Sequence, residues 1–373
     1  MQSTSKANAV DRDRERRNEG RTASVVAHES GVRLLRTEGE NLKGSCSCDP
    51  RASERTRAHA IGVSNRIDRA YRRIARSLSN ATLLQDTDDT ASEAEETGET
   101  LMRDKDRGRR FLDHYGALGL RVAFERYGLL AALERRGFPT VQVETHVHAD
   151  RHELLVTSGA HRLVEIVLRR DILTVPHDAL DATDVDTPPE VYRVLTIDWL
   201  ALQNPCESFS AERPRLPGQS FPGLGIGWRV MTLLARMVER LELDAFVTVA
   251  EYLHNAELYA REMPHLDPRE SGRLTALLRT LRTEERLTTA QASWAMEWGL
   301  VYEDGGDVAR WRGELQVAAE HGGLRAHWAT PRYRERLRES AEQFRYVLDR
   351  SAFDTRWKRS LDWVEGRTPQ APE

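Results

Sequence analysis

The sequence has few cysteines, little net charge and no long apolar run, and each shortage excludes a class of protein. Three cysteines in 373 residues are too few for a disulfide framework. Lysine plus arginine (55) nearly balances aspartate plus glutamate (59), so the net charge of -4 gives no overall attraction for nucleic acid. No apolar stretch approaches the roughly 20 residues of a membrane-spanning helix, and the charged beginning of the chain is unlike a secretory signal. We therefore expect a soluble, cytoplasmic protein without a membrane span.

Charge and hydropathy divide the chain into three parts. Residues 1–58 are polar and have no sustained period, which is typical of disorder, and residues 81–100 are acidic, with no lysine or arginine. Beyond about residue 109 the apolar residues recur at helical and strand spacings. We expect a largely disordered charged arm over 1–105, a folded domain over 106–268 and a mostly helical extension over 269–373.

One amphipathic helix is predicted inside the charged arm. Ile67, Tyr71, Ile74 and Leu78 fall on one helical stripe, and the opposite face carries arginines. The helix near 66–78 is expected to dock locally with a solvated basic face; docking to a partner, a membrane or a nucleic acid is the alternative.

The middle of the chain predicts an α+β fold. Three runs read as strands, and the first two are separated by short turns, as in an antiparallel meander. A loop rich in proline and glycine follows, then a helix, a strand and a further helix. The runs are Thr140–His148, Arg162–Ile172 and Val191–Leu202; the later elements are Trp228–Glu242, Ala245–Ala250 and a helix beginning near His254.

The C-terminal part is predicted to be helical and rich in tryptophan. Thr330 followed by Pro331 is a helix-start signal. The tryptophans are expected to be core anchors that cover the sheet or the seam of a homodimer, and ligand stacking is the alternative.

Gly223, Gly225 and Gly227 alternate immediately before a helix. Such a loop brings backbone N–H groups close to a phosphate, and the helix start adds partial positive charge. The spacing excludes the dinucleotide fingerprint, and the absence of a nearby lysine excludes a Walker loop. A tight turn into the helix without any ligand is the alternative.

The order of elements around this loop resembles the core of the GNAT superfamily of acyl-CoA N-acyltransferases. The likeness covers roughly residues 109–268 and implies a central mixed sheet flanked by helices, with acetyl-CoA as acyl donor and a small-molecule or protein amine as acceptor. It implies that Tyr259, in the pair Leu258-Tyr259, protonates the departing thiolate. It also implies a cofactor site made of the strand residues Leu200, Ala201 and Leu202 and the loop residues Gly223, Leu224, Gly225, Ile226, Gly227 and Trp228.

Some positions depart from the pattern of that superfamily. Pro222 stands where the family has arginine or glutamine, and it brings neither a side-chain donor nor a backbone N–H. Asn255 lies closer to Tyr259 than the family's asparagine does, and Met263-Pro264 replaces the usual Gly-Phe. A degenerate acyltransferase-like domain that binds or scaffolds without catalysis is therefore the alternative function.

A general base must relieve the incoming amine of its proton. Asp198 on the third strand run and His254 after the last strand are the leading candidates, and Glu251 is another.

Residues His146, His148, Asp150 and His152 alternate along THVHADRHE. Residues two apart on a strand share a face, so this row could converge on a metal and serve a metal-dependent hydrolase. The alternatives are a solvent-facing polar row and a general base facing the substrate.

Overall fold

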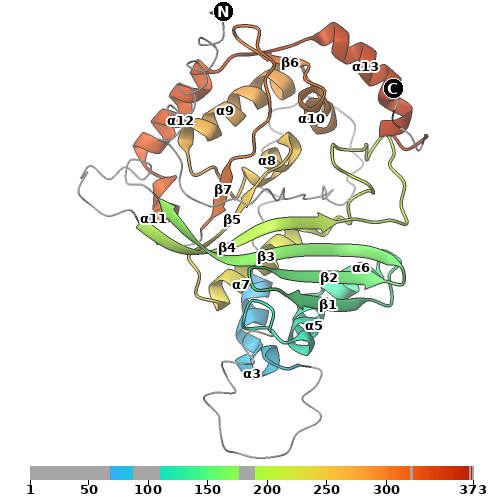
Figure 1. Cartoon of the computed structure of the whole chain (residues 1–373), viewed down its shortest axis with the longest axis vertical. Helices are drawn as coiled ribbons and strands as arrows, with labels where there is room; N and C mark the ends of the chain where they lie inside the picture. Colours follow the sequence, from blue (N-terminus) through green and yellow to red (C-terminus); the bar gives the residue numbers. More distant parts are fainter. Residues whose placement is uncertain (1–67, 87–109, 176–189, 320–321, 369–370, 372–373) are drawn as a thin grey trace, which may run out of the picture.

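The computed structural model of the chain describes residues 68–86, 110–175, 190–319, 322–368 and 371. Most of the expected charged arm, including residues 1–58, lies outside the described residues. The fold is α+β, with a six-stranded mixed sheet and packed helices (Figure 1), as the sequence predicts. Within the described ranges, no helix combines the length and the apolar character that crossing a bilayer requires.

The sheet has the strand order β1-β2-β3-β4-β5-β7. The first four strands form an antiparallel meander, in which β2 adds one strand between the first two of the three predicted runs. Strand β5 runs parallel to β4, and β7 is antiparallel to β5. The parallel pair is joined by a crossover that contains helix α7 (Gly227–Arg240). The strands are β1 (Gln142–Val147), β2 (His152–Ser158), β3 (His161–Val175), β4 (Glu190–Leu202), β5 (Ala245–Val249) and β7 (Leu315–Ala318).

One face of the meander is covered by α5 (Ala117–Arg126), α6 (Leu129–Glu134) and α7. Strand alternation turns every second residue toward these helices, so Leu154 and Ile166 meet Val230 and Leu233 of α7. The apolar residues of α7 recur at helical spacing, which gives the helix one face for the sheet. The main hydrophobic core therefore lies between α7 and the sheet.

The helix predicted near 66–78 is present over 68–77, and it packs on this same core. Tyr71 and Leu78 are buried, and the Tyr71 hydroxyl donates to the Tyr127 carbonyl at 2.8 Å. Arg240 of α7 donates to the Leu78 carbonyl at 3.0 Å. The short helix α3 (Asn80–Leu83) follows and buries Leu83. Residues 68–86 thus share a core with α5 and α7, although they precede the boundary expected at residue 105.

The segment after β5 is mainly helical, as predicted, but it is not a separate appendage. Its strand β7 returns to the main sheet, and β6 (Val301–Glu303) pairs with β8 (Tyr346–Leu348) in a second, small sheet. The Thr330 side chain accepts from the Tyr333 N–H at 3.2 Å, which confirms the predicted helix start. The helical elements are α8 (Leu253–Tyr259), α9 (Pro268–Leu278), the π-helical turn η1 (Arg279–Glu284), α10 (Thr289–Glu297), α11 (Gly322–His327), α12 (Pro331–Gln343) and α13 (Arg350–Val364).

Four tryptophans of this part pack against one another inside the chain. Trp294 of α10 lies 5.4 Å from Trp298 and 5.2 Å from Trp363 of α13, measured between ring centroids. Trp298 in turn lies 6.2 Å from Trp357. These rings hold α13 against α10, as core anchors do.

Candidate functional site

Strands β4 and β5 separate at their carboxyl ends. Their parallel pairing ends at Ile197 and Thr248, whereas β4 continues to Leu202. The pairing with β3 shifts at the same point, because Val167 lies opposite Trp199 and Leu168 lies opposite Ile197. Asp198 is therefore the extra residue of a β-bulge, a feature that bends the strand that contains it.

The end of β4 directs the backbone groups of two residues toward the gap that this separation leaves. The Gln203 N–H donates to Leu163 at 2.9 Å, toward β3. Successive residues of an antiparallel strand point their backbone groups to opposite sides, so Ala201 also faces β3 and Leu200 faces away from it. Of the three strand residues predicted to bind a cofactor, Leu200 and Leu202 therefore face the gap, and Leu202 already accepts a bond from Leu224.

The segment 223–227, which precedes α7 and which we call the glycine loop, lies beside the end of β4. The Leu224 N–H donates to the Leu202 carbonyl at 3.2 Å, and the Asn204 N–H donates to the Pro222 carbonyl at 2.7 Å. Gly225 has a φ of 65°, in the left-handed region that favours glycine. Helix α7 then begins at Gly227 with no side-chain cap.

Four consecutive backbone N–H groups of this loop have no acceptor among the described residues. They belong to Gly225, Ile226, Gly227 and Trp228, and we call them the N–H cradle. Unpaired N–H groups at a helix start, with the partial positive charge of the helix, form an anion-binding site. The cradle is therefore suited to a phosphate or a carboxylate.

Arginines surround the cradle. The guanidinium of Arg136, which follows α6, donates to the carbonyls of Leu224 and Gly225, the second at 3.1 Å. Arg213 donates to the Gly223 carbonyl at 2.5 Å, and Arg229 lies 4.4 Å from the centre of the Trp228 ring. Burial lowers the pKa of Arg136, and the charges of Arg135 and Arg229 lower it further. This accumulation of positive charge favours an anionic ligand.

Helix α8 begins at the same edge of the sheet, just after β5, and carries two polar side chains on one face. Asn255 is 1% exposed, and neither its amide oxygen nor its amide nitrogen has a hydrogen-bond partner among the residues that the structure describes. Tyr259, one turn later, is buried, its hydroxyl makes no hydrogen bond to the described part of the chain, and burial raises the pKa of its phenol. Buried polar groups are nearly always paired, so the Asn255 amide is available to a water or a ligand.

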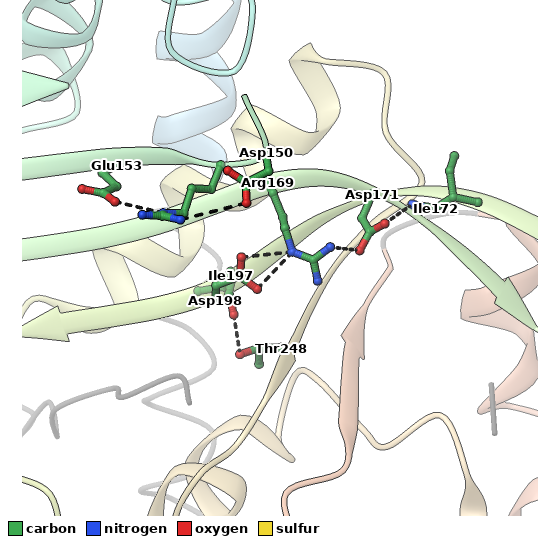
Figure 2. A network of polar contacts seen from close by, with 9 residues as sticks. Asp150, Glu153, Arg169, Asp171, Ile172, Ile197, Asp198 and Thr248 are labelled. Atoms are coloured by element: carbon green, nitrogen blue, oxygen red, sulfur yellow. Dashed lines mark hydrogen bonds and ion pairs between the residues drawn. The ribbon is translucent and has the colours of Figure 1, made fainter. Parts of the chain in front are cut away.

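Asp198 is already held by an ion pair, as Figure 2 shows. Its carboxylate accepts from Arg169 at 3.0 and 3.2 Å, and the same guanidinium also contacts Asp171. Burial raises the pKa of Asp198, and Arg169 opposes this shift. The bulge thus places Asp198 in a salt-bridge network instead of leaving it as an unpaired base.

His254 is also engaged within the protein. Its backbone N–H donates to the Ser293 hydroxyl of α10 at 3.0 Å, its Nδ1 lies 3.0 Å from the same hydroxyl, and its ring stacks on Tyr252. The two leading candidates for the general base are therefore both held by other side chains.

The histidine row does not converge. Val147 is paired with His152 and His146 with Glu153, so His146 and His152 lie on opposite faces of the sheet. His152 is buried, and its Nδ1 accepts from the Leu112 N–H at 3.1 Å, whereas His146, His148 and Asp150 are exposed. Within the ranges that the structure describes, no group of three histidine, cysteine, aspartate or glutamate side chains is placed to hold a metal.

Sequence reasoning missed Arg136 and Arg213, which hold the carbonyls of the glycine loop. Arg136 precedes Leu224 by 88 residues, and no local pattern marks it. Comparison of the chain with protein-family models, with curated proteins and with solved structures finds no match in any of the three. The functional inference therefore depends on the geometry of the site.

Proposed function

We propose that this chain is an acyl-CoA-dependent N-acyltransferase of the GNAT type. It would transfer an acyl group, acetyl in the simplest case, to an amine while donor and acceptor are bound together. The observation that carries the proposal is the N–H cradle at the start of α7, beside the point where two parallel strands separate. The antiparallel meander, the parallel β4–β5 pair and the bulge at Asp198 support the same likeness.

The residues around the gap fit an acyl-CoA. The cradle would bind the pyrophosphate, and the nearby arginines would add attraction for the phosphates. The pantetheine arm would lie in the gap between β4 and β5, with the Asn255 amide available to its peptide-like groups. The N–H of Leu200 would polarise the acyl carbonyl, as an oxyanion-hole donor does. Acyl-CoA would supply a thioester carbonyl that an amine can attack.

Tyr259 is suited to the general-acid role. Because burial raises the pKa of its phenol, the hydroxyl keeps its proton at neutral pH. It could then donate that proton to the departing thiolate, whose negative charge would otherwise develop in a desolvated site. The cradle follows β4 and Tyr259 follows β5. Because these two strands are parallel, their carboxyl ends lie at the same edge of the sheet, and ligands of such sheets bind at this edge.

A binding module without catalysis is the second candidate function. The observation that favours it is that Asp198 is paired with Arg169 and His254 with Ser293, so both leading candidates for the general base already have partners within the protein. The two functions differ in one measurement: a module binds acetyl-CoA without releasing free thiol in the presence of a panel of amines, whereas an enzyme releases it.

Binding of acetyl-CoA, measured by calorimetry and thermal unfolding, tests the proposal. At about 100 times its dissociation constant, a ligand stabilises the folded state by about 2.7 kcal/mol. The variant Gly225→Glu places a carboxylate at the cradle and should abolish this stabilisation. Gly159→Glu is the matched control, because Gly159 is also left-handed, with a φ of 57° and nothing within 4 Å of an added Cβ. Absence of binding in the wild-type protein, or equal binding by both variants, would refute the proposal.

A further inference from the structure

One side chain outside the glycine loop, Arg136, holds two of the loop's carbonyl groups. Arg136 donates from Nη1 to the Ala132 carbonyl of α6 at 2.9 Å, from Nε to the Leu224 carbonyl, and from Nη2 to the Gly225 carbonyl at 3.1 Å. The planar guanidinium has its donors in a fixed fork, so these contacts set the positions of both loop carbonyls together. The loop is thereby tied to the end of α6.

Fixing these carbonyls also fixes two N–H groups of the cradle. In a planar trans peptide the C=O of one residue and the N–H of the next point in opposite directions. The Leu224 carbonyl shares its peptide plane with the Gly225 N–H, and the Gly225 carbonyl shares its plane with the Ile226 N–H. Because Arg136 holds both carbonyls on its own side, both N–H groups point away from Arg136.

Without this contact the carbonyls would compete with the ligand. A carbonyl oxygen turned toward the cradle would repel an anion, and Gly225, which has no Cβ, presents little steric barrier to rotation of the peptide groups on either side of it. Pro222, in the preceding part of the loop, offers neither a side-chain donor nor an N–H for the task. Arg213 does not replace Arg136, since it holds the Gly223 carbonyl, whose partner N–H on Leu224 is already bonded to Leu202.

We infer that Arg136 is a positioning residue that holds the N–H cradle open for the pyrophosphate of the donor. This inference rests on the proposed function for the identity of the ligand, but the cradle itself requires only a diphosphate. Burial, and after it the charges of Arg135 and Arg229, lower the pKa of Arg136 and so disfavour its charged form, and a bound anion would offset the repulsion from these charges. A bound anion would thus favour the charged form of Arg136 even without direct contact between them.

The test uses the full chain with Arg136→Lys, Arg136→Met and the control Arg135→Met. Lysine keeps the charge but has no fork to hold two carbonyls together. Arg135→Met removes one positive charge from the same turn, and Arg135 makes no contact with the loop carbonyls. Calorimetric titrations with coenzyme A, with pantetheine and with inorganic pyrophosphate give the dissociation constants, and thermal unfolding without ligand monitors the fold.

Both Arg136 variants should bind coenzyme A and pyrophosphate at least about tenfold more weakly, the effect of losing a hydrogen bond to a charged group. Pantetheine, which lacks the pyrophosphate, should bind as it does to the wild type, and Arg135→Met should stay within about twofold. Wild-type affinity for coenzyme A or pyrophosphate in Arg136→Lys would overturn the inference. Equal losses for pantetheine and coenzyme A would do so too, because they indicate a general structural defect. Binding of pyrophosphate that depends on Arg136, without binding of coenzyme A, would sustain the inference and refute the acyltransferase.

Discussion

Deleting residues 1–105 should destabilise the protein strongly, whereas deleting residues 1–67 should leave the described contacts of the N-terminal helix in place. The first deletion removes Tyr71, Leu78 and Leu83, all of which are buried in the main core. It also removes the hydrogen bond from Tyr71 to the Tyr127 carbonyl and the carbonyl that Arg240 contacts at Leu78. The difference between the two deletions therefore isolates the packing of residues 68–86.

The expected size follows from the buried side chains. Full burial of one large apolar side chain contributes about 1.5–3 kcal/mol, so three contribute about 4.5–9 kcal/mol, an upper estimate because unfolded chains already bury some surface. A lost hydrogen bond adds about 1 kcal/mol. A net loss on the order of 5 kcal/mol is comparable with the whole stability of an ordinary domain, about 5–15 kcal/mol.

Urea unfolding followed by circular dichroism, at one pH and with both deletions beside the full chain, measures this difference. The point variant Leu78→Ala in the full chain should lose about 2–5 kcal/mol for the same reason. The reasoning fails if the 1–105 deletion has an unfolding midpoint equal to that of the 1–67 deletion, or if Leu78→Ala is neutral.

Two further predictions concern buried polar residues. Burial lowers the pKa of His265 from 6.5 to about 4. As the pH falls, the His265 imidazole therefore takes up a proton in the unfolded chain before it does so in the folded protein. Stability should therefore fall by up to about 3 kcal/mol as the pH drops from 6.5 to 4. In urea unfolding, the free energy of unfolding should depend less steeply on pH over this range in His265→Leu, but not in the exposed control His161→Leu. Equal pH dependence in His265→Leu and the wild type would contradict the assignment. Asn255→Leu should leave the empty protein at least as stable as the wild type, because no hydrogen bond is lost, yet weaken acetyl-CoA binding. In the control, Asn204→Leu, the free energy of unfolding should fall by about 1–3 kcal/mol, since the Asn204 amide oxygen accepts from the Cys206 N–H. An Asn255→Leu protein that is destabilised but binds acetyl-CoA normally would refute the ligand role of Asn255.

Where local pattern and packing agree, the sequence was sufficient. The run Val191–Leu202 is rich in β-branched and aromatic residues and forms the central strand β4. The stripe that includes Tyr71 and Leu78 forms a helix whose apolar side is buried. In both cases the residues that favour an element also supply the face that it buries.

Strand β7 was not predicted because the segments that pair with it lie elsewhere in the chain. Only Leu315–Ala318 form it, and this short run follows a segment with no strand period. Its backbone pairs with β5 on one side and, through the Val317 N–H and the Leu315 carbonyl, with Pro264 and Leu266 on the other. Such long-range pairing leaves no periodic signal in a run of this length.

The candidate site shows the same division between local and distant signals. The alternation of glycines before α7 predicted a loop that brings backbone N–H groups to the helix start, because backbone conformation there is a local property; anion binding by this loop stays a prediction. The environment of Asp198 was not predictable, since its Arg169 partner lies on the neighbouring strand and the bulge that orients it comes from the shift in register. Spacing predicts which faces side chains share, but it does not predict which of them an ion pair already occupies.

The polar groups for which the described residues offer no partner are the reason for assigning the proposed function to this edge of the sheet. Folding leaves few buried polar groups unpaired, because each costs about 1–3 kcal/mol. Here the four N–H groups of the cradle follow β4, and the Asn255 amide follows β5. Parallel strands bring their carboxyl ends together, so both sets lie at one edge, next to the gap where β4 and β5 separate. A ligand with an anionic part and amide groups would satisfy both sets at once. Acyl-CoA has this combination and a simple phosphate does not, which supports the proposed donor.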